Sequence, residues 1–196
     1  MIRVLLILAL LTPVFAAEAN EGASSHHSKY AGQQGREIKS LSAEDIAELR
    51  RGGGWGLAKA AELNGVPGPI HLLEMKDKID LDETQHSAIN AIYQRMKSRA
   101  ILHGERLIDL ERHLESGFRN RSITDALLRD SLSAIADTKK ELRYVHLAAH
   151  IETLKILTEK QVKTYNALRG YSKADPCASV PKGHNAEMWR RHNNCD

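Results

Sequence analysis

The chain has 196 residues and a net charge of +3, with 5% aromatic residues and with basic and acidic residues interspersed. This balance excludes the basic, aromatic-rich surface that is typical of nucleic-acid-binding proteins. The length allows one domain of ordinary size, and no apolar run reaches the roughly 20 residues of a membrane-spanning helix.

The first 16 residues have the pattern of a signal peptide. Arg3 provides the positive charge and residues 4–11 form a short apolar core. The small residues before and at Ala16 mark the first choice of cleavage site, and Ala19 marks the second. We therefore expect an exported, soluble mature protein, with a retained N-terminal anchor as the alternative reading.

Residues 17–41 are small and polar, which predicts a flexible leader. Over residues 42–67 the sequence predicts two short helices and a Gly/Pro linker. The first helix begins at Ser42, with Asp45 at the capping-box position, and ends at Gly52-Gly53-Gly54. The second short helix is expected over residues 55–63.

Residues 68–170 form the expected main domain. A helix is predicted over 69–79, with Pro69 at its first position, and a last one begins at Thr158 and ends near Gly170. Between them, apolar residues repeat every three or four positions over 83–118 and 123–155. Two long helices joined by a tight turn pack antiparallel, so the fold class is all-α, a long antiparallel helical hairpin with short flanking helices.

The hairpin leaves part of its apolar stripe to be covered by the short helices or by a second subunit, so we expect a homodimer. If the chain reverses at Asn120 and Arg121, Met96 and Tyr93 lie opposite residues 145–148.

A short phrase occurs twice, and both copies are capping-box sequences that predict a helix start. The copies read Leu81-Asp82-Glu83-Thr84-Gln85 and Leu157-Thr158-Glu159-Lys160-Gln161. LTxxQ phrases in a small exported helical protein resemble the Spy/CpxP family, which includes the metal-responsive ZraP and CnrX proteins. The resemblance covers about residues 69–170, and Asp82 departs from the family threonine. It implies a periplasmic α-helical dimer that either holds unfolded clients without ATP or serves envelope-stress or metal-responsive signalling.

Two histidine-containing pairs have the spacing of metal ligands on one helix face: His71 with Met75, and His146 with His150. The CnrX-like pattern implies an i, i+4 pair on the first helix, a carboxylate on the next and an i, i+4 pair late in the third. This sequence has no counterpart of that carboxylate, because the matching place on the second helix falls near Tyr93 and Gln94. Ligands of His and Met type favour copper over zinc, nickel or cobalt; the alternative is that His146 and the methionines are core residues without a metal.

The tail, residues 171–196, contains both cysteines, Cys177 and Cys195. In an oxidising compartment such a pair is expected to form a disulfide. A zinc cluster with His184 and His192 is the alternative, although the gaps between these residues differ from those of a compact zinc finger.

The sequence contains no nucleophile motif, so we expect no enzyme. The leading hypothesis is a periplasmic ATP-independent chaperone or envelope-stress factor whose partners are unfolded envelope proteins or a membrane sensor protein. Its client surface would combine exposed apolar side chains with arginines along the edges of the hairpin. Those arginines are Arg95, Arg99, Arg106 and Arg143. The alternative is a periplasmic heavy-metal sensor or metal-binding protein.

Overall fold

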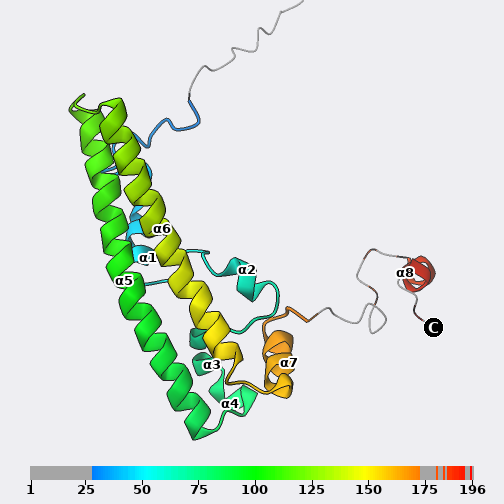
Figure 1. Cartoon of the computed structure of the whole chain (residues 1–196). Helices are drawn as coiled ribbons and strands as arrows, with labels where there is room; N and C mark the ends of the chain where they lie inside the picture. Colours follow the sequence, from blue (N-terminus) through cyan, green and yellow to red (C-terminus); the bar gives the residue numbers. More distant parts are fainter. Residues whose placement is uncertain (1–27, 173–179, 181–182, 184, 193–194, 196) are drawn as a thin grey trace, which may run out of the picture. The chain divides into compact units, whose positions relative to one another are not determined.

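The computed structural model describes residues 28–172, 180, 183, 185–192 and 195 (Figure 1). The predicted signal peptide, residues 17–27 of the predicted leader and Cys177 lie outside the described residues. Residues 28–34 form turns and belong to a separate unit from Gly35 onward. All regular elements in the described part are helices: α1 Ala43–Arg50, α2 Lys59–Glu62, α3 Pro69–Glu74, α4 Lys76–Ile79, α5 Glu83–Arg119, α6 Asp125–Leu154, α7 Glu159–Leu168 and α8 Ala186–His192.

The two long helices, α5 and α6, pack against each other in opposite directions, which confirms the predicted helical hairpin (Figure 1). Their facing apolar side chains form one buried cluster, which includes Ala100, Leu107, Ile108, Ile135, Leu142 and Val145. The predicted register is also present, because Met96 and Val145 line the same hollow between the helices. Leu132, which belongs to the apolar repeat predicted over 123–155, does not join this cluster, because its side chain is exposed near the hairpin tip. None of the described helices is long and apolar enough to cross a membrane.

The two capping-box phrases lie side by side at the open end of the hairpin. Each forms a complete box, with Asp82 and Thr158 as the N-caps of α5 and α7. The amide groups of Gln85 and Gln161 also bond each other, at N···O distances of 3.0 and 2.8 Å. The same amide nitrogens donate to the carbonyls of Ile156 and Asp80. The repeat therefore joins the starts of two helices that are distant in sequence.

The predicted helix over 69–79 is broken at Met75, whose backbone leaves the helical region at φ −110° and ψ 17°. The break lets residues from both short helices reach one buried cluster with α5 and α7. That cluster contains Leu72, Ile79, Ile89 and Tyr165, and Met75 packs against it. Packing of the cluster thus overrides the continuous helix that the sequence predicts.

The second predicted short helix, over 55–63, is reduced to α2. Trp55 and Gly56 both have positive φ, at 43° and 70°, and a left-handed backbone cannot continue a right-handed helix. Trp55 is held in this conformation by its indole N–H, which donates to the Asp45 carboxylate at 2.7 Å.

The end of the predicted flexible leader is packed against the hairpin, which corrects the prediction for residues 35–41. Ile38 and Leu41 are buried in the core cluster of α5 and α6. The Ser40 hydroxyl donates to the buried Glu111 carboxylate at 2.8 Å, and Lys39 pairs with Glu115 at 2.8 Å. These residues cover part of the apolar stripe that the sequence left to a second subunit.

Candidate functional site

A cavity of about 540 Å³ lies where the connection from α1 to α3 crosses the hairpin. The loop from Gly52 to Gly56 and part of α2 form one wall. Side chains from α3, α5 and α6 form the other walls, among them His71, Tyr93, Met96, His146 and His150. The structure therefore brings three of the four predicted metal-site residues to one cavity, together with Met96.

His150 is only 4% exposed and its ring is held in one orientation. Its Nδ1 lies 2.8 Å from the carbonyl oxygen of Val66. Because a carbonyl can only accept, Nδ1 must carry the hydrogen, and in the neutral ring Nε2 then keeps its lone pair. A ligand histidine usually has this arrangement, with the second ring nitrogen donating to a backbone carbonyl.

Gly68 leaves the space beside this ring open. A Cβ atom at position 68 would lie 2.6 Å from Cε1 and 2.7 Å from Nε2 of His150. The side chain of any other residue would therefore clash with the edge of the imidazole that carries Nε2.

His146 lies one helical turn earlier on α6 and is also 4% exposed. Its Nε2 is buried and has no hydrogen-bond partner. An unpaired polar atom in a protein interior is costly, and most buried polar atoms have partners. The cavity beside this nitrogen is where a ligand atom could satisfy it.

Burial lowers the pKa of both His146 and His150 below the ordinary value of 6.5. Each ring is further affected by a neighbouring histidine, since His150 lowers the pKa of His146 and His71 lowers that of His150. The carboxylate of Glu62 opposes these effects. Both rings are therefore neutral near pH 7, the state in which imidazole binds metal ions.

His71 contributes from α3, at the opposite wall. Its Nδ1 lies 2.8 Å from the Glu74 carboxylate, and its side chain is partly exposed. A carboxylate partner on one ring nitrogen orients the other nitrogen for a metal ion.

Met75, the fourth predicted residue, does not line this cavity and packs instead against the apolar cluster of Leu72 and Tyr165. The break between α3 and α4 accounts for this, because Met75 stands at the break and its non-helical backbone takes it off the helix face of His71. Met96 from α5 is the thioether that the cavity offers in its place.

The donor set fits a transition metal in its ligand type, because buried neutral imidazoles are good ligands for copper, zinc and nickel, and that of His150 has its tautomer fixed. Within the described residues, no three His, Cys, Asp or Glu side chains are close enough to share one ion. His146 and His150 are therefore the two candidate ligands that one helix, α6, brings to the cavity.

Sequence reasoning missed the loop that covers the histidines. The carbonyl of Val66 comes from the expected Gly/Pro linker, Gly68 follows it at the start of the expected main domain, and the acid of Glu62 comes from the second expected short helix. The run of glycines and prolines there was a signal, since such residues allow close approach of a backbone to a ring.

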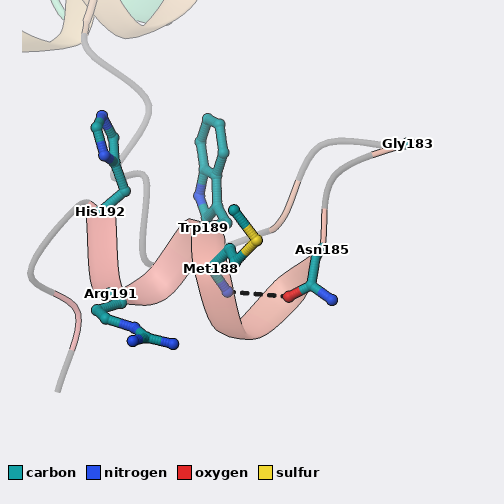
Figure 2. Close-up of a pocket in the computed structure, with 6 residues that line it drawn as sticks. All are labelled: Gly183, Asn185, Met188, Trp189, Arg191 and His192. Atoms are coloured by element: carbon teal, nitrogen blue, oxygen red, sulfur yellow. Dashed lines mark hydrogen bonds between the residues drawn. The ribbon is translucent and has the colours of Figure 1, made fainter.

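A separate hollow of about 940 Å³ lies beside α8 and is formed by tail residues alone. Figure 2 shows its lining, which consists of Gly183, Asn185, Met188, Trp189, Arg191 and His192. The Asn185 side chain caps the helix by accepting from the Met188 N–H at 2.9 Å. Cys177 and His184 lie outside the described residues, so the disulfide to Cys195 and the alternative zinc cluster stay predictions.

Comparison with known proteins adds no assignment to this site. No family model, no curated protein and no solved structure matches the chain. The resemblance to the Spy/CpxP family therefore still rests on the two capping-box phrases, the long helices between them and the predicted signal peptide.

Proposed function

We propose that this chain is an exported, periplasmic binding protein of Spy/CpxP type without enzymatic activity, and that it responds to a transition metal ion. The single observation that carries the proposal is the buried, unpaired Nε2 of His146. It lies one turn from a second buried histidine whose tautomer is fixed by the Val66 carbonyl.

In this proposal His146 and His150 bind the metal through Nε2, and His71 is the third candidate ligand. The bound ion would supply positive charge and coordination that join α3 to α6. The residues of this chain do the rest: Val66 and Glu74 hold the rings in position, and Gly68 leaves room for the ligand edge. Copper is the expected metal because of the nearby Met96, and zinc, nickel and cobalt are the alternatives.

Isothermal titration calorimetry of the mature, metal-free protein tests this function. We expect one equivalent of Cu²⁺, Zn²⁺, Ni²⁺ or Co²⁺ to bind, and we expect His146→Ala with His150→Ala to abolish that binding. The matched control is His86→Ala with His113→Ala, which removes two histidines of α5 that do not line the cavity. Equal binding by both double variants would rule out the proposed site.

A second candidate function is ATP-independent protection of unfolded proteins, and exposed apolar side chains favour it. Leu102, Tyr144 and Ile151 are large and exposed on the long helices. Arg95, Arg99, Arg106 and Arg143 are exposed on the same helices, which matches the expected combination of charge steering and apolar contact. Light scattering of an aggregating client protein tests this function. Suppression at equimolar amounts supports it, and aggregation that is unchanged by an excess of the protein contradicts it.

A further inference from the structure

The cavity that contains the histidines is much larger than a metal ion requires. Its volume is about 540 Å³, whereas one water molecule occupies about 30 Å³ of the liquid. Sites for small organic molecules have volumes of about 300–1,000 Å³. The cavity therefore has room for an organic molecule beside a metal ion.

The side chains of the cavity leave coordination positions on a metal ion open. His146 and His150 offer two imidazoles from α6, and His71 lies at the opposite wall. In the part of the chain that the structure describes, no three His, Cys, Asp or Glu side chains are close enough to share one ion. Zinc commonly takes four donor atoms, and a site with fewer protein ligands is completed by water or by another molecule. A second molecule with oxygen donors can therefore complete the coordination here.

Two lysines bring positive charge to the cavity. Lys59 from α2 and Lys97 from α5 both line it. Neither ammonium group has an ion-pair partner among the residues that the structure describes. The Lys97 ammonium instead lies 5.8 Å from the centre of the Tyr93 ring, which also lines the cavity. Both lysines are therefore available to bind an anion.

The acidic side chains of the lining already have partners. Glu48 and Glu62 are the acidic residues that line the cavity in the described part of the chain. The Glu48 carboxylate pairs with the guanidinium of Arg51, and the Glu62 carboxylate lies 3.8 Å from the guanidinium of Arg169 on α7. The charges of the two lysines are therefore not balanced from within this lining.

This charge distribution favours an anionic metal complex over a bare metal ion. A divalent cation alone would add positive charge beside the two ammonium groups, and like charges repel more strongly in a partly buried site than in water. A complex of the same ion with a small polycarboxylate has no positive net charge. Its carboxylate oxygens can also accept charge-assisted hydrogen bonds from lysines. Because the two lysines come from different helices, a ligand with several carboxylates can meet each of them separately.

We propose that the cavity takes its metal ion as a complex with a small polycarboxylate chelator. The imidazoles of His146 and His150 bind the ion. The ammonium groups of Lys59 and Lys97 bind carboxylates of the chelator. This inference rests on the proposed metal function and names the chemical form in which the ion is bound.

Equilibrium dialysis of the mature protein tests this proposal, with radiolabelled citrate as the polycarboxylate and with Zn²⁺, which has no redox chemistry. We expect one citrate per chain to be retained together with zinc, and none to be retained without zinc. The variant Lys59→Gln with Lys97→Gln should bind the zinc–citrate complex at least about tenfold more weakly, because it lacks both charge-assisted hydrogen bonds. The same variant should bind Zn²⁺ alone at least as well as the native chain, because two repelling charges are absent. A purely structural effect of the substitutions would weaken both kinds of binding.

Two control variants separate the effect of charge from those of packing and position. Lys59→Arg with Lys97→Arg keeps the positive charge and is expected to bind the complex like the native chain. Lys76→Gln with Lys155→Gln removes two lysines that do not line the cavity and is expected to have no effect. Circular dichroism verifies that all variants fold.

Three results would overturn the inference: zinc binding without retention of citrate, equal retention of citrate by the native chain and the Lys59→Gln, Lys97→Gln variant, or retention of citrate without zinc. The first two results leave the proposed metal site intact. A chain that binds zinc neither alone nor with citrate would contradict the proposed function as well.

Discussion

At the scale of single residues, Gly68 decides how the imidazole of His150 is placed. Replacing it by alanine puts a Cβ atom 2.7 Å from Nε2. We expect Gly68→Ala to lower the free energy of unfolding by about 1–3 kcal/mol through overpacking, measured by urea denaturation, and to weaken metal binding. Gly35→Ala is the control, because nothing lies within 4 Å of its Cβ position. Equal effects of the two changes would show that position 68 does not constrain the ring.

The two buried histidines make stability depend on pH. Their pKa is lowered in the folded state, so the unfolded chain binds more protons below the ordinary value of 6.5. The stability they contribute is complete above that value and decreases as the pH falls through it. We expect urea midpoints to decrease from pH 7 toward pH 5, above the range where carboxylates titrate.

Replacing both rings by glutamine removes the groups that titrate. The variant His146→Gln with His150→Gln is therefore expected to lose most of this slope, whatever its stability at neutral pH. If the double variant keeps the slope of the native chain, other groups must be responsible.

At the scale of helices, the paired amides of Gln85 and Gln161 join the starts of α5 and α7. Truncation of either to alanine removes its own capping contacts and one partner of the other amide, which keeps its bond to Ile156 or Asp80; we expect a cost of about 1–3 kcal/mol. The double variant should cost less than the sum of the singles, with a coupling energy of about 0.5–3 kcal/mol. A double-mutant cycle by urea denaturation measures this, and Gln94→Ala on the exposed face of α5 is the control. Additive effects would mean that the two boxes act separately.

The segment before α1 is the second test at this scale, because its side chains complete the hairpin core. Ile38 is buried with Leu107 and Ile135. We expect Ile38→Ala to cost about 2–5 kcal/mol, as removal of a buried isoleucine does. Leu63→Ala removes an exposed side chain and should change the free energy of unfolding by less than about 0.5 kcal/mol. A similar small effect at position 38 would place it outside the cooperative core.

Sequence patterns predicted the elements that local chemistry controls. The capping boxes at Ser42, Asp82 and Thr158 all form, and the three-and-four spacing placed both long helices within two residues of their ends. The patterns failed where contacts from distant residues decide. The break at Met75, the left-handed Trp55 and the burial of Ile38 each depend on packing partners that the local sequence does not contain.

The candidate site also has one part that local sequence patterns predicted and another that depends on distant contacts. Helical spacing was sufficient to pair His146 with His150, and the hairpin register was sufficient to place Met96 near them. The hydrogen bond between Val66 and His150 joins the connection before α3 to the distant helix α6. No periodic pattern in the sequence predicts such a contact.

At the scale of the whole molecule, the segment from α1 to α3 crosses the α5–α6 hairpin and closes a cavity over two of its histidines. A ligand that binds only the folded state stabilises it by an amount set by its affinity. If the cavity binds a metal ion, the ion must therefore raise the stability of the entire domain, and it must do so through the α6 pair.

The most direct test is urea denaturation of the mature protein with and without Cu²⁺ or Zn²⁺, on the native chain and on His146→Ala with His150→Ala. For free metal at about 100 times its dissociation constant, the native chain should gain about 2.7 kcal/mol, and the double variant should gain none. The absence of any gain in the native chain, or an equal gain in both proteins, would contradict the account.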